Sequence, residues 1–289
     1  MLRSLYSGVT GLRNHQTKMD VIGNNIANVN TIGYKSSRVA FQDIYSQTIQ
    51  TATAPQAGGN GLGGVNPQQI GLGVSVGSID VMHTRGAPEY TGAPLDLSID
   101  GDGFFIVSDG PYDYFTRAGN FTTDAANNLT NSNGLIVQGW SVDNGTLDAD
   151  GQLIMGPEGE VPEIGSIALD PDFYDINVTR NGELVGINNE TQQREVIARI
   201  VLANFNNQNA LSKMGNNLYD VSQNSGLPLI GVPGTEGIAG INPSSLEMSN
   251  VDLAKEFTDM ITTQRGFQAN SRIITTSDQL LEELVNLKR

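Results

Sequence analysis

Apolar residues recur every seven positions near both ends of the chain. The C-terminal series consists of Leu246, Leu253, Met260, Phe267, Ile274 and Leu281, joined by Phe257 and Val285. The N-terminal series, with steps of three, four or seven, consists of Leu2, Leu5, Val9, Leu12, Met19, Ile22, Ile26 and Val29. This period predicts two amphipathic, coiled-coil-like helices, the second over about residues 251–287. A chain with helices at both ends leaves only its middle for another kind of structure.

Neither predicted helix is expected to be stable alone. Gly8, Gly11 and Gly23 each cost roughly 1 kcal/mol relative to alanine inside a helix. The seam positions expected to accompany the C-terminal series are polar, namely Gln264, Ser271 and Asp278. A stripe that is only half apolar suits a helix packed among several neighbours, although pairing of the two helices inside one globular monomer stays open. The predicted assembly seam consists of Leu5, Val9, Leu12, Met19, Ile22, Ile26, Leu253, Phe257, Met260, Phe267, Ile274 and Leu281.

The middle of the chain has the pattern of an antiparallel β-domain. Short strand-like runs occupy residues 74–81, 95–99, 104–107, 135–140 and 197–205. Between the runs, Asp-Gly pairs begin at residues 100, 102, 109 and 150 and Asn-Gly pairs at 133, 144 and 181. These pairs supply the positive φ angles of tight hairpins. Residues 51–73 lack periodicity and are expected to form an adaptable connector, with 226–243 as its counterpart on the way back.

The predicted class is therefore α+β, with helices at both ends and a central, mostly antiparallel β-domain. We expect a terminal helical assembly domain over residues 1–30 and 246–289. A linker region follows over 31–73, and an outer β-domain over 74–245.

The net charge of −15 is concentrated in the middle of the chain. Residues 51–245 carry six basic and twenty-two acidic side chains, a net of −16. Such a segment repels nucleic acid and anionic lipid, so neither is expected as a partner. No apolar run approaches the ~20 residues of a membrane-spanning helix, and the first twenty residues lack the apolar core of a cleaved signal peptide.

No catalytic, cofactor or metal site is expected. The chain has no cysteine, which excludes disulfides and thiolate chemistry, and its two histidines, His15 and His83, lie far apart in the sequence. Residues 96–101 match the start of a calcium-binding loop, but position 12 of that loop is Val107 instead of glutamate, so a hairpin turn is the simpler interpretation. A secreted β-rich enzyme with helical ends is the alternative class, and no sequence feature supports it.

Several long motifs nevertheless resemble one family. The segments SGVTGLRNHQTKMDVIGNNIANVNTIGYK near the start and QRGFQANSRIITT near the end resemble the terminal signatures of bacterial flagellar rod and hook proteins. LDLSIDGDGFFIV, YFTRAGNFTTD and NNLTNSNGLIVQGW resemble the β-domain of the same family. Residues 141–175 are the least characteristic part, and no role is predicted for them.

The resemblance implies a tubular polymer of one subunit type. The terminal helices would form an inner tube with the β-domain outside, and the polymer would transmit motor torque for motility. Subunits of this family pass through the flagellar type III export apparatus without a cleaved signal peptide. The implied partners are other copies of the chain and the flagellar rod, hook cap and hook–filament junction proteins. The implied location is the extracellular hook or the basal body.

Hook and distal rod are the two positions that the resemblance leaves open. The ending LVNLKR and the two terminal signatures are more hook-like, and they predict a short hook protein. The 51–73 insertion and the length of the chain favour the alternative, a distal-rod subunit.

An asparagine-rich stretch marks the expected end of the first helix. The predicted helix-to-linker joint consists of Asn24, Asn25, Asn28, Asn30 and Gly33. In one interpretation these residues cap a frayed helix end, since asparagine and glycine tolerate left-handed conformations. In the other, the amides form hydrogen bonds to neighbouring subunits.

Overall fold

The computed structural model describes residues 2–54, 63–142, 145–148, 153–154, 162–235 and 237–287. These residues form two compact units. The first, called the helical unit, comprises Met1–Ala27, Ser37–Val81 and Asp252–Arg289. The second, called the β-unit, comprises Asn28–Ser36 and Met82–Val251. The predicted α+β class, with helices at both ends and an antiparallel β-domain between them, is confirmed.

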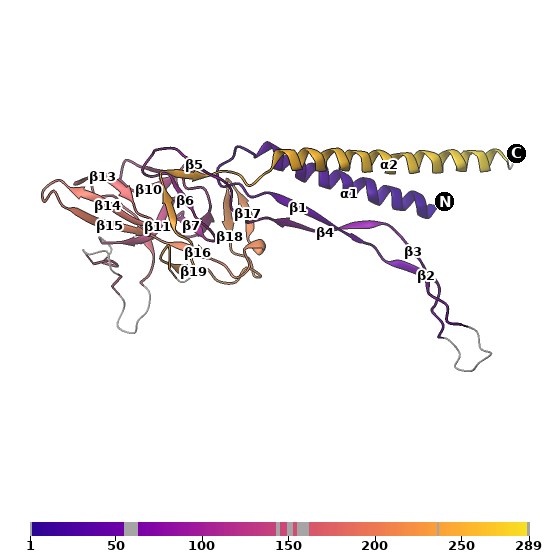
Figure 1. The fold of residues 1–289 in the computed structure, drawn as a ribbon, viewed down its shortest axis with the longest axis horizontal. Coiled ribbons are helices and arrows are strands. Elements are labelled where there is room, and N and C mark those ends of the chain that lie inside the picture. The colour runs from indigo at the N-terminus through magenta and orange to yellow at the C-terminus, as the bar shows by residue number, and fades with distance from the viewer. Residues whose placement is uncertain are drawn as a thin grey trace. The chain divides into compact units, whose positions relative to one another are not determined.

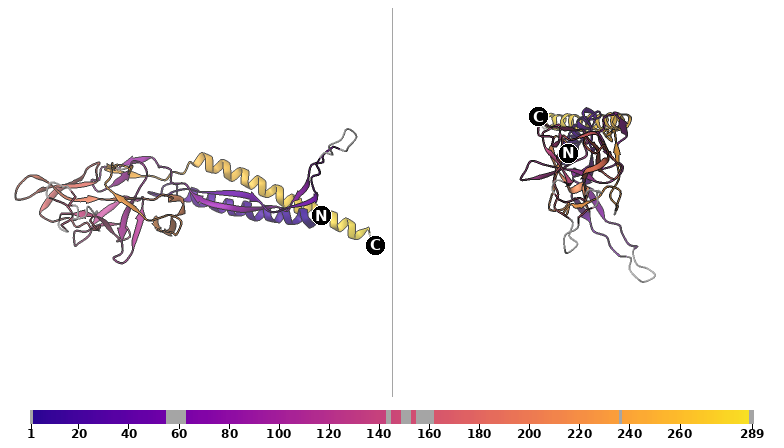
Figure 2. Two further views of the ribbon diagram at one scale, coloured as in Figure 1. Left: turned by 90° about the horizontal axis from the view of Figure 1, so that it is seen from below. Right: turned by 90° about the vertical axis from the view of Figure 1, so that its left-hand side faces the viewer.

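Two long helices lie side by side in the helical unit (Figures 1 and 2). They are α1 (Leu2–Ala27) and α2 (Leu253–Asn286). Gly8 faces Ile274 and Gly11 faces Asn270, so the helices run antiparallel. By this register, the last turns of α2 extend beyond the N-terminus of α1, as both figures show. Asp252 begins α2, because its carboxylate accepts hydrogen bonds from the first free backbone N–H groups.

A two-stranded ribbon accompanies the helices. Its first part pairs β1 (Ser37–Asp43) with β4 (Val74–Val81), and its second pairs β2 (Ser46–Gln50) with β3 (Gln68–Gly71). The prediction of an adaptable connector over 51–73 is therefore wrong for Gln68–Gly71, which form β3. Residues 55–62 lie outside the described residues. Sequence periodicity missed β2 and β3 because both strands are almost entirely exposed, so neither face needs apolar residues.

The predicted strand at 74–81 is present with those bounds, but it lies in the helical unit instead of the β-unit. Its partner is β1, within the segment expected to be linker.

Seventeen strands and one short 3-10 helix, η1 (Gln208–Ala210), occupy the described part of the β-unit. The strands are β5 (Pro88–Tyr90), β6 (Leu97–Ile99), β7 (Phe104–Ser108), β8 (Asp113–Thr116), β9 (Phe121–Thr123), β10 (Leu129–Asn131), β11 (Ile136–Ser141), β12 (Gly165–Ser166), β13 (Phe173–Val178), β14 (Glu183–Asn188), β15 (Arg194–Ile200), β16 (Leu202–Asn204), β17 (Ser212–Gly215), β18 (Leu218–Asp220), β19 (Leu229–Gly231), β20 (Ile241–Pro243) and β21 (Ser245–Glu247). Thirteen of them join one branched antiparallel sheet, whose main path is β13-β14-β15-β11-β7-β8-β18-β17. The pairs β6–β20 and β5–β21 stand apart from it.

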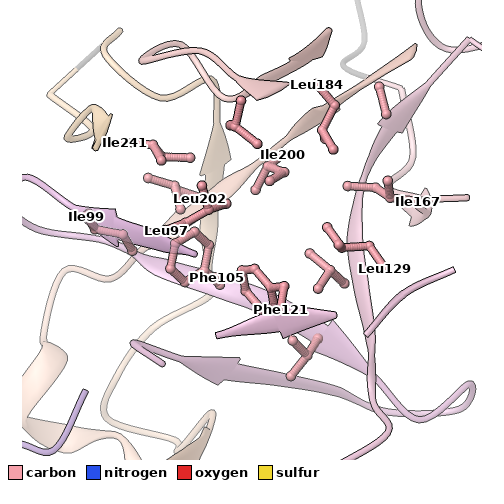
Figure 3. Close-up of a cluster of buried hydrophobic side chains, with 14 of the residues drawn as sticks. Leu97, Ile99, Phe105, Phe121, Leu129, Ile167, Leu184, Ile200, Leu202 and Ile241 are labelled. Atoms are coloured by element: carbon pink, nitrogen blue, oxygen red, sulfur yellow. The ribbon is translucent and has the colours of Figure 1, made fainter. Parts of the chain in front are cut away.

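Strand β7 supplies both apolar cores of the β-unit. Phe105 and Val107 point into the cluster drawn in Figure 3, which also contains Leu97, Leu129 and Ile200. Phe104 and Ile106 point the other way, into a cluster around Trp140 and Tyr219. A strand buried on both faces reads as a continuous apolar run, which explains why FFIV was visible in the sequence.

Three of the predicted hairpin turns are present. Gly110, Gly134 and Gly182 have φ angles of +88°, +80° and +77° and connect β7 to β8, β10 to β11, and β13 to β14. The prediction fails at Asp100-Gly101 and Asp102-Gly103, because β6 pairs with β20 while β7 pairs with β8. The pairs at 144 and 150 include residues outside the described ranges.

Two further strand predictions need correction. The run at 197–205 is divided between β15 and β16, with a break at Val201. The segment 226–243, expected to be a connector, contains β19 and β20, which pair with β16 and β6 inside the β-unit.

Candidate functional site

Most of the predicted seam residues are at least partly covered, and Ile274 of α2 packs against Gly8 of α1. Ile22 is buried. The half-buried members are Leu5, Val9, Leu12, Met19, Ile26, Met260, Phe267, Ile274 and Leu281. Leu253 and Phe257 do not join them, because their side chains are 40% and 50% exposed.

The companion row of the heptad series differs from the predicted one. Thr263 and Ser277 are the buried side chains of α2, and they lie three residues after Met260 and Ile274 instead of four. Gln264 and Asp278 are exposed. Because this row is small and polar, sequence hydrophobicity could not identify it.

Glycines explain how close the two helices come. A Cβ atom on Gly11 would lie 2.5 Å from Nδ2 of Asn270, and one on Gly8 would lie 3.3 Å from Cγ1 of Ile274. A Cβ atom on Gly266 would lie 2.7 Å from the His15 ring. The residues that weaken the helices in isolation therefore allow them to pack closely. Gly23 does not share this role, because a Cβ atom there would have no neighbour within 4 Å.

Large apolar side chains remain exposed on the helical unit. We use the name open face for the exposed apolar side chains of α2 and its C-cap together: Leu253, Phe257, Ile261, Ile273, Leu280, Leu284, Val285 and the C-cap residue Leu287. At 3.6 residues per turn, Leu253, Phe257 and Ile261 lie on one side of the helix, and Ile273, Leu280 and Leu284 lie on another. Those on the ribbon are Phe41, Tyr45, Ile49, Val65, Ile70 and Ile79. Exposed apolar area on this scale marks an interaction surface.

The predicted helix-to-linker joint forms hydrogen bonds within the chain. Asn25 is buried, donates from Nδ2 to Ser37 O at 2.9 Å and accepts at Oδ1 from Ser37 N at 3.0 Å. Its Nδ2 also donates to Glu256 Oε1 at 3.3 Å, and burial raises the pKa of that carboxyl. Asn28 accepts from the Thr31 hydroxyl at 3.1 Å. Asn25 therefore joins α1, β1 and α2.

The two remaining asparagines of the joint, Asn24 and Asn30, are exposed. Asn30 borders a hollow of about 310 Å³ in the β-unit, together with Asn120, Asn133 and Asn216. Hydrogen bonds from these amides to neighbouring subunits stay a prediction.

The backbone conformation at position 33 requires glycine. Its φ of +68° is left-handed, and its N–H donates to Glu247 O at 2.7 Å. A Cβ atom there would lie 2.7 Å from Ala118 N. Glycine is the residue that avoids both the conformational cost and the clash.

A buried charge cluster that the sequence did not indicate surrounds Glu247. Lys35 Nζ lies 2.6 Å from Glu247 Oε1, and Arg117 Nη1 lies 3.4 Å from Oε2. All three side chains are at most 1% exposed. Burial lowers the pKa values of both cations, and the Glu247 carboxylate opposes that shift. The three residues are far apart in sequence, and no local pattern separates them from exposed charges.

The described residues hold no arrangement suited to metal chemistry. No three of their His, Asp or Glu side chains gather closely enough to bind a metal ion. His83 packs against Phe104 and Tyr219, and His15 against Phe41. Neither α1 nor α2 is long and apolar enough to cross a membrane.

Three family models match the chain in order. A flagella basal body rod protein model covers residues 5–35, a flagellar hook protein FlgE/F/G D1 domain model covers 98–186, and a flagellar basal body rod FlgEFG protein C-terminal model covers 242–287. Together the three models match the terminal helices and part of the β-unit to structural components of the bacterial flagellum.

Individual relatives agree with these models. The flagellar basal-body rod protein FlgG of Bacillus subtilis is 46% identical over 290 residues, covering all of both chains. The FlgG protein of Agrobacterium fabrum is 35% identical over 96% of this chain and 97% of its own. The flagellar hook protein FlgE of Borreliella burgdorferi is 33% identical, and the alignment covers all of both chains over 445 residues. The chain belongs to the flagellar rod and hook protein family.

Proposed function

We propose that this chain is the subunit of the distal rod, the alternative weighed above, instead of a short hook protein. One observation carries the proposal: the rod relative from Bacillus subtilis matches end to end over 290 residues, which is almost the length of this chain. The hook relatives need alignments of 445 and 467 residues, so they contain long insertions that this chain lacks.

The ribbon gives structural support to the rod. The insertion at residues 51–73 is the sequence feature that favours a distal-rod subunit. The strands at its two ends are paired with each other. Ser46–Gln50 pairs with Gln68–Gly71, and Thr53 bridges to Val65. Ordered backbone pairing in this segment suits a stiff shaft better than a flexible joint.

The open face of α2 supports self-assembly. Its exposed leucine, isoleucine and phenylalanine side chains gain free energy when other copies cover them, at roughly 25 cal/mol per Å² of apolar area. The proposed role is structural, not enzymatic: a helical homopolymer that transmits torque. The proposed partners are other copies, neighbouring rod and hook proteins, and the flagellar export apparatus, which the chain would pass without a cleaved signal peptide.

The test is the structure of basal bodies purified from a strain that lacks the gene. The expected basal bodies end within the rod and carry neither hook nor filament. Restoring the gene on a plasmid should restore both. Basal bodies with a complete rod and no curved extension would instead identify a hook subunit.

A further inference from the structure

Two segments of the β-unit lead toward the terminal helices in the sequence. The inbound segment is residues 28–36, which follow α1, and the outbound segment is residues 244–251, which precede α2. Backbone bonds link them directly, since Gly33 N donates to Glu247 O at 2.7 Å. A third segment, residues 82–87, follows β4 and lies beside both.

The Glu247 carboxylate is the point where these segments meet. Its Oε1 accepts from Lys35 Nζ of the inbound segment at 2.6 Å and from Gly86 N of the third segment at 2.9 Å. Its Oε2 faces Arg117 Nη1, and Arg117 is held by Gly101 O at 2.7 Å, next to the apolar core. The buried Glu247 side chain of the outbound segment therefore contacts the inbound segment, the third segment and Arg117.

Asn250 repeats the arrangement near the end of the outbound segment. Its Oδ1 accepts from Ser36 N at 2.8 Å, and its Nδ2 donates to Met82 O at 2.7 Å. Thr84 O accepts from both Asn250 and Lys35. The same three segments are thus joined a second time by side-chain bonds.

The charges make Glu247 irreplaceable within this network. Two buried cations, Lys35 and Arg117, share one buried carboxylate. In the described part of the chain, Nε and Nη2 of Arg117 have no hydrogen-bond partner. Without the Glu247 carboxylate, the two desolvated cations would keep only the weaker attraction of the exposed Asp102, whereas removal of Lys35 would leave a neutral Arg117–Glu247 pair.

We propose that Glu247 acts as a clasp that makes the inbound and outbound segments one cooperative element, so that both are held or released together. If the chain transmits torque, as the proposed function states, torque on either terminal helix would reach the β-unit through both segments. Backbone pairing alone would not couple them in this way, because each segment could open separately.

Amide hydrogen exchange on the full-length chain tests the clasp. Glu247→Gln keeps the size of the side chain and the backbone carbonyl that accepts from Gly33. The clasp predicts that exchange at Gly33 and at Met248 nevertheless rises together, by tenfold or more. Amides of β7 in the core should keep their wild-type rates.

Two variants serve as comparisons. Arg85→Gln removes an exposed ion pair with Asp100 in the same region and should leave both segments unchanged. Lys35→Met keeps the neutral pair and should have a smaller effect than Glu247→Gln. If Glu247→Gln does not fold, the double variant Lys35→Met/Glu247→Gln, with one unpaired cation instead of two, reports on the same amides.

Three results would overturn the clasp. They are a rise at only one or at neither of Gly33 and Met248 in Glu247→Gln, an equal rise throughout the β7 core, and a larger effect of Lys35→Met than of Glu247→Gln. None of them depends on whether the chain belongs to rod or hook, so the basal-body experiment can fail or succeed independently.

Discussion

At the scale of single residues, His83 makes the β-unit sensitive to acid. Burial lowers its pKa to about 4, and the nearby cations Arg117, Lys35 and Lys213 contribute to that shift. The unfolded chain, with an ordinary histidine pKa near 6.5, therefore binds a proton that the folded chain refuses. Stability should fall as the pH drops from 6.5 toward 4, by about 1.5 kcal/mol between pH 6.5 and 5.

Urea unfolding at the two pH values, followed by the fluorescence of Trp140, measures this difference. Trp140 is the only tryptophan and is buried in the β-unit, so its signal reports on that unit. The variant His83→Gln should lose most of the pH dependence. An unchanged slope in that variant would assign the acid sensitivity to another group.

Gly33 and Gly134 separate the cost of a left-handed residue from the cost of a clash. Both have positive φ, but a Cβ atom at Gly134 would have no neighbour within 4 Å, whereas one at Gly33 would meet the backbone of Arg117 and Ala118. Gly134→Ala should cost about 1 kcal/mol. Gly33→Ala should cost clearly more in the same urea experiment, and equal costs would show that the loop relaxes around the new methyl group.

Some of these residues were predictable from the sequence, and others were not. Asn-Gly and Asp-Gly pairs marked several turns because the φ requirement is local. The cluster of Lys35, Arg117 and Glu247 remained hidden, since its members meet only after three distant segments have folded together.

At the scale of elements, the open face of α2 should control assembly. Ile261 is 59% exposed, so Ile261→Asp should leave the melting of the monomer nearly unchanged. A carboxylate buried between copies would cost several kcal/mol per contact, so polymers should not form. Sedimentation of assembled material measures the effect, with the exposed neighbour Thr262→Asp as the matched control. Normal polymers of Ile261→Asp would place the assembly surface elsewhere.

Helices and buried strands were predictable because their periodicity records which face is covered. The helix prediction of about 251–287 compares with Leu253–Asn286, and the strand at 74–81 agrees with β4. Strand partners were not predictable, because β6–β20 and β5–β21 join segments more than a hundred residues apart. The companion row of α2 was missed because Thr263 and Ser277 are polar.

At the scale of the whole molecule, burial is very uneven between the two units. Among the described residues, Ile22 is the only buried hydrophobic side chain of the helical unit, while the β-unit has two clusters. Limited trypsin digestion of the monomer should therefore cut first at Arg13 and Arg265 and trim to a fragment ending at Lys255. Mass spectrometry identifies the fragments. Faster cleavage at Arg194, an exposed residue of β15, would contradict this order.

The ribbon has an elastic consequence. The segment from Ser37 to Gln50 contains fourteen residues. If these residues were unpaired, they would behave as an entropic spring with a typical end-to-end distance of about 21 Å. The same residues as extended strands span about 46 Å. Because a returning strand is hydrogen-bonded alongside, the ribbon is already near full extension and cannot lengthen further without breaking those bonds. The ribbon therefore resists stretching, and a tensile force along it is transmitted with little elongation.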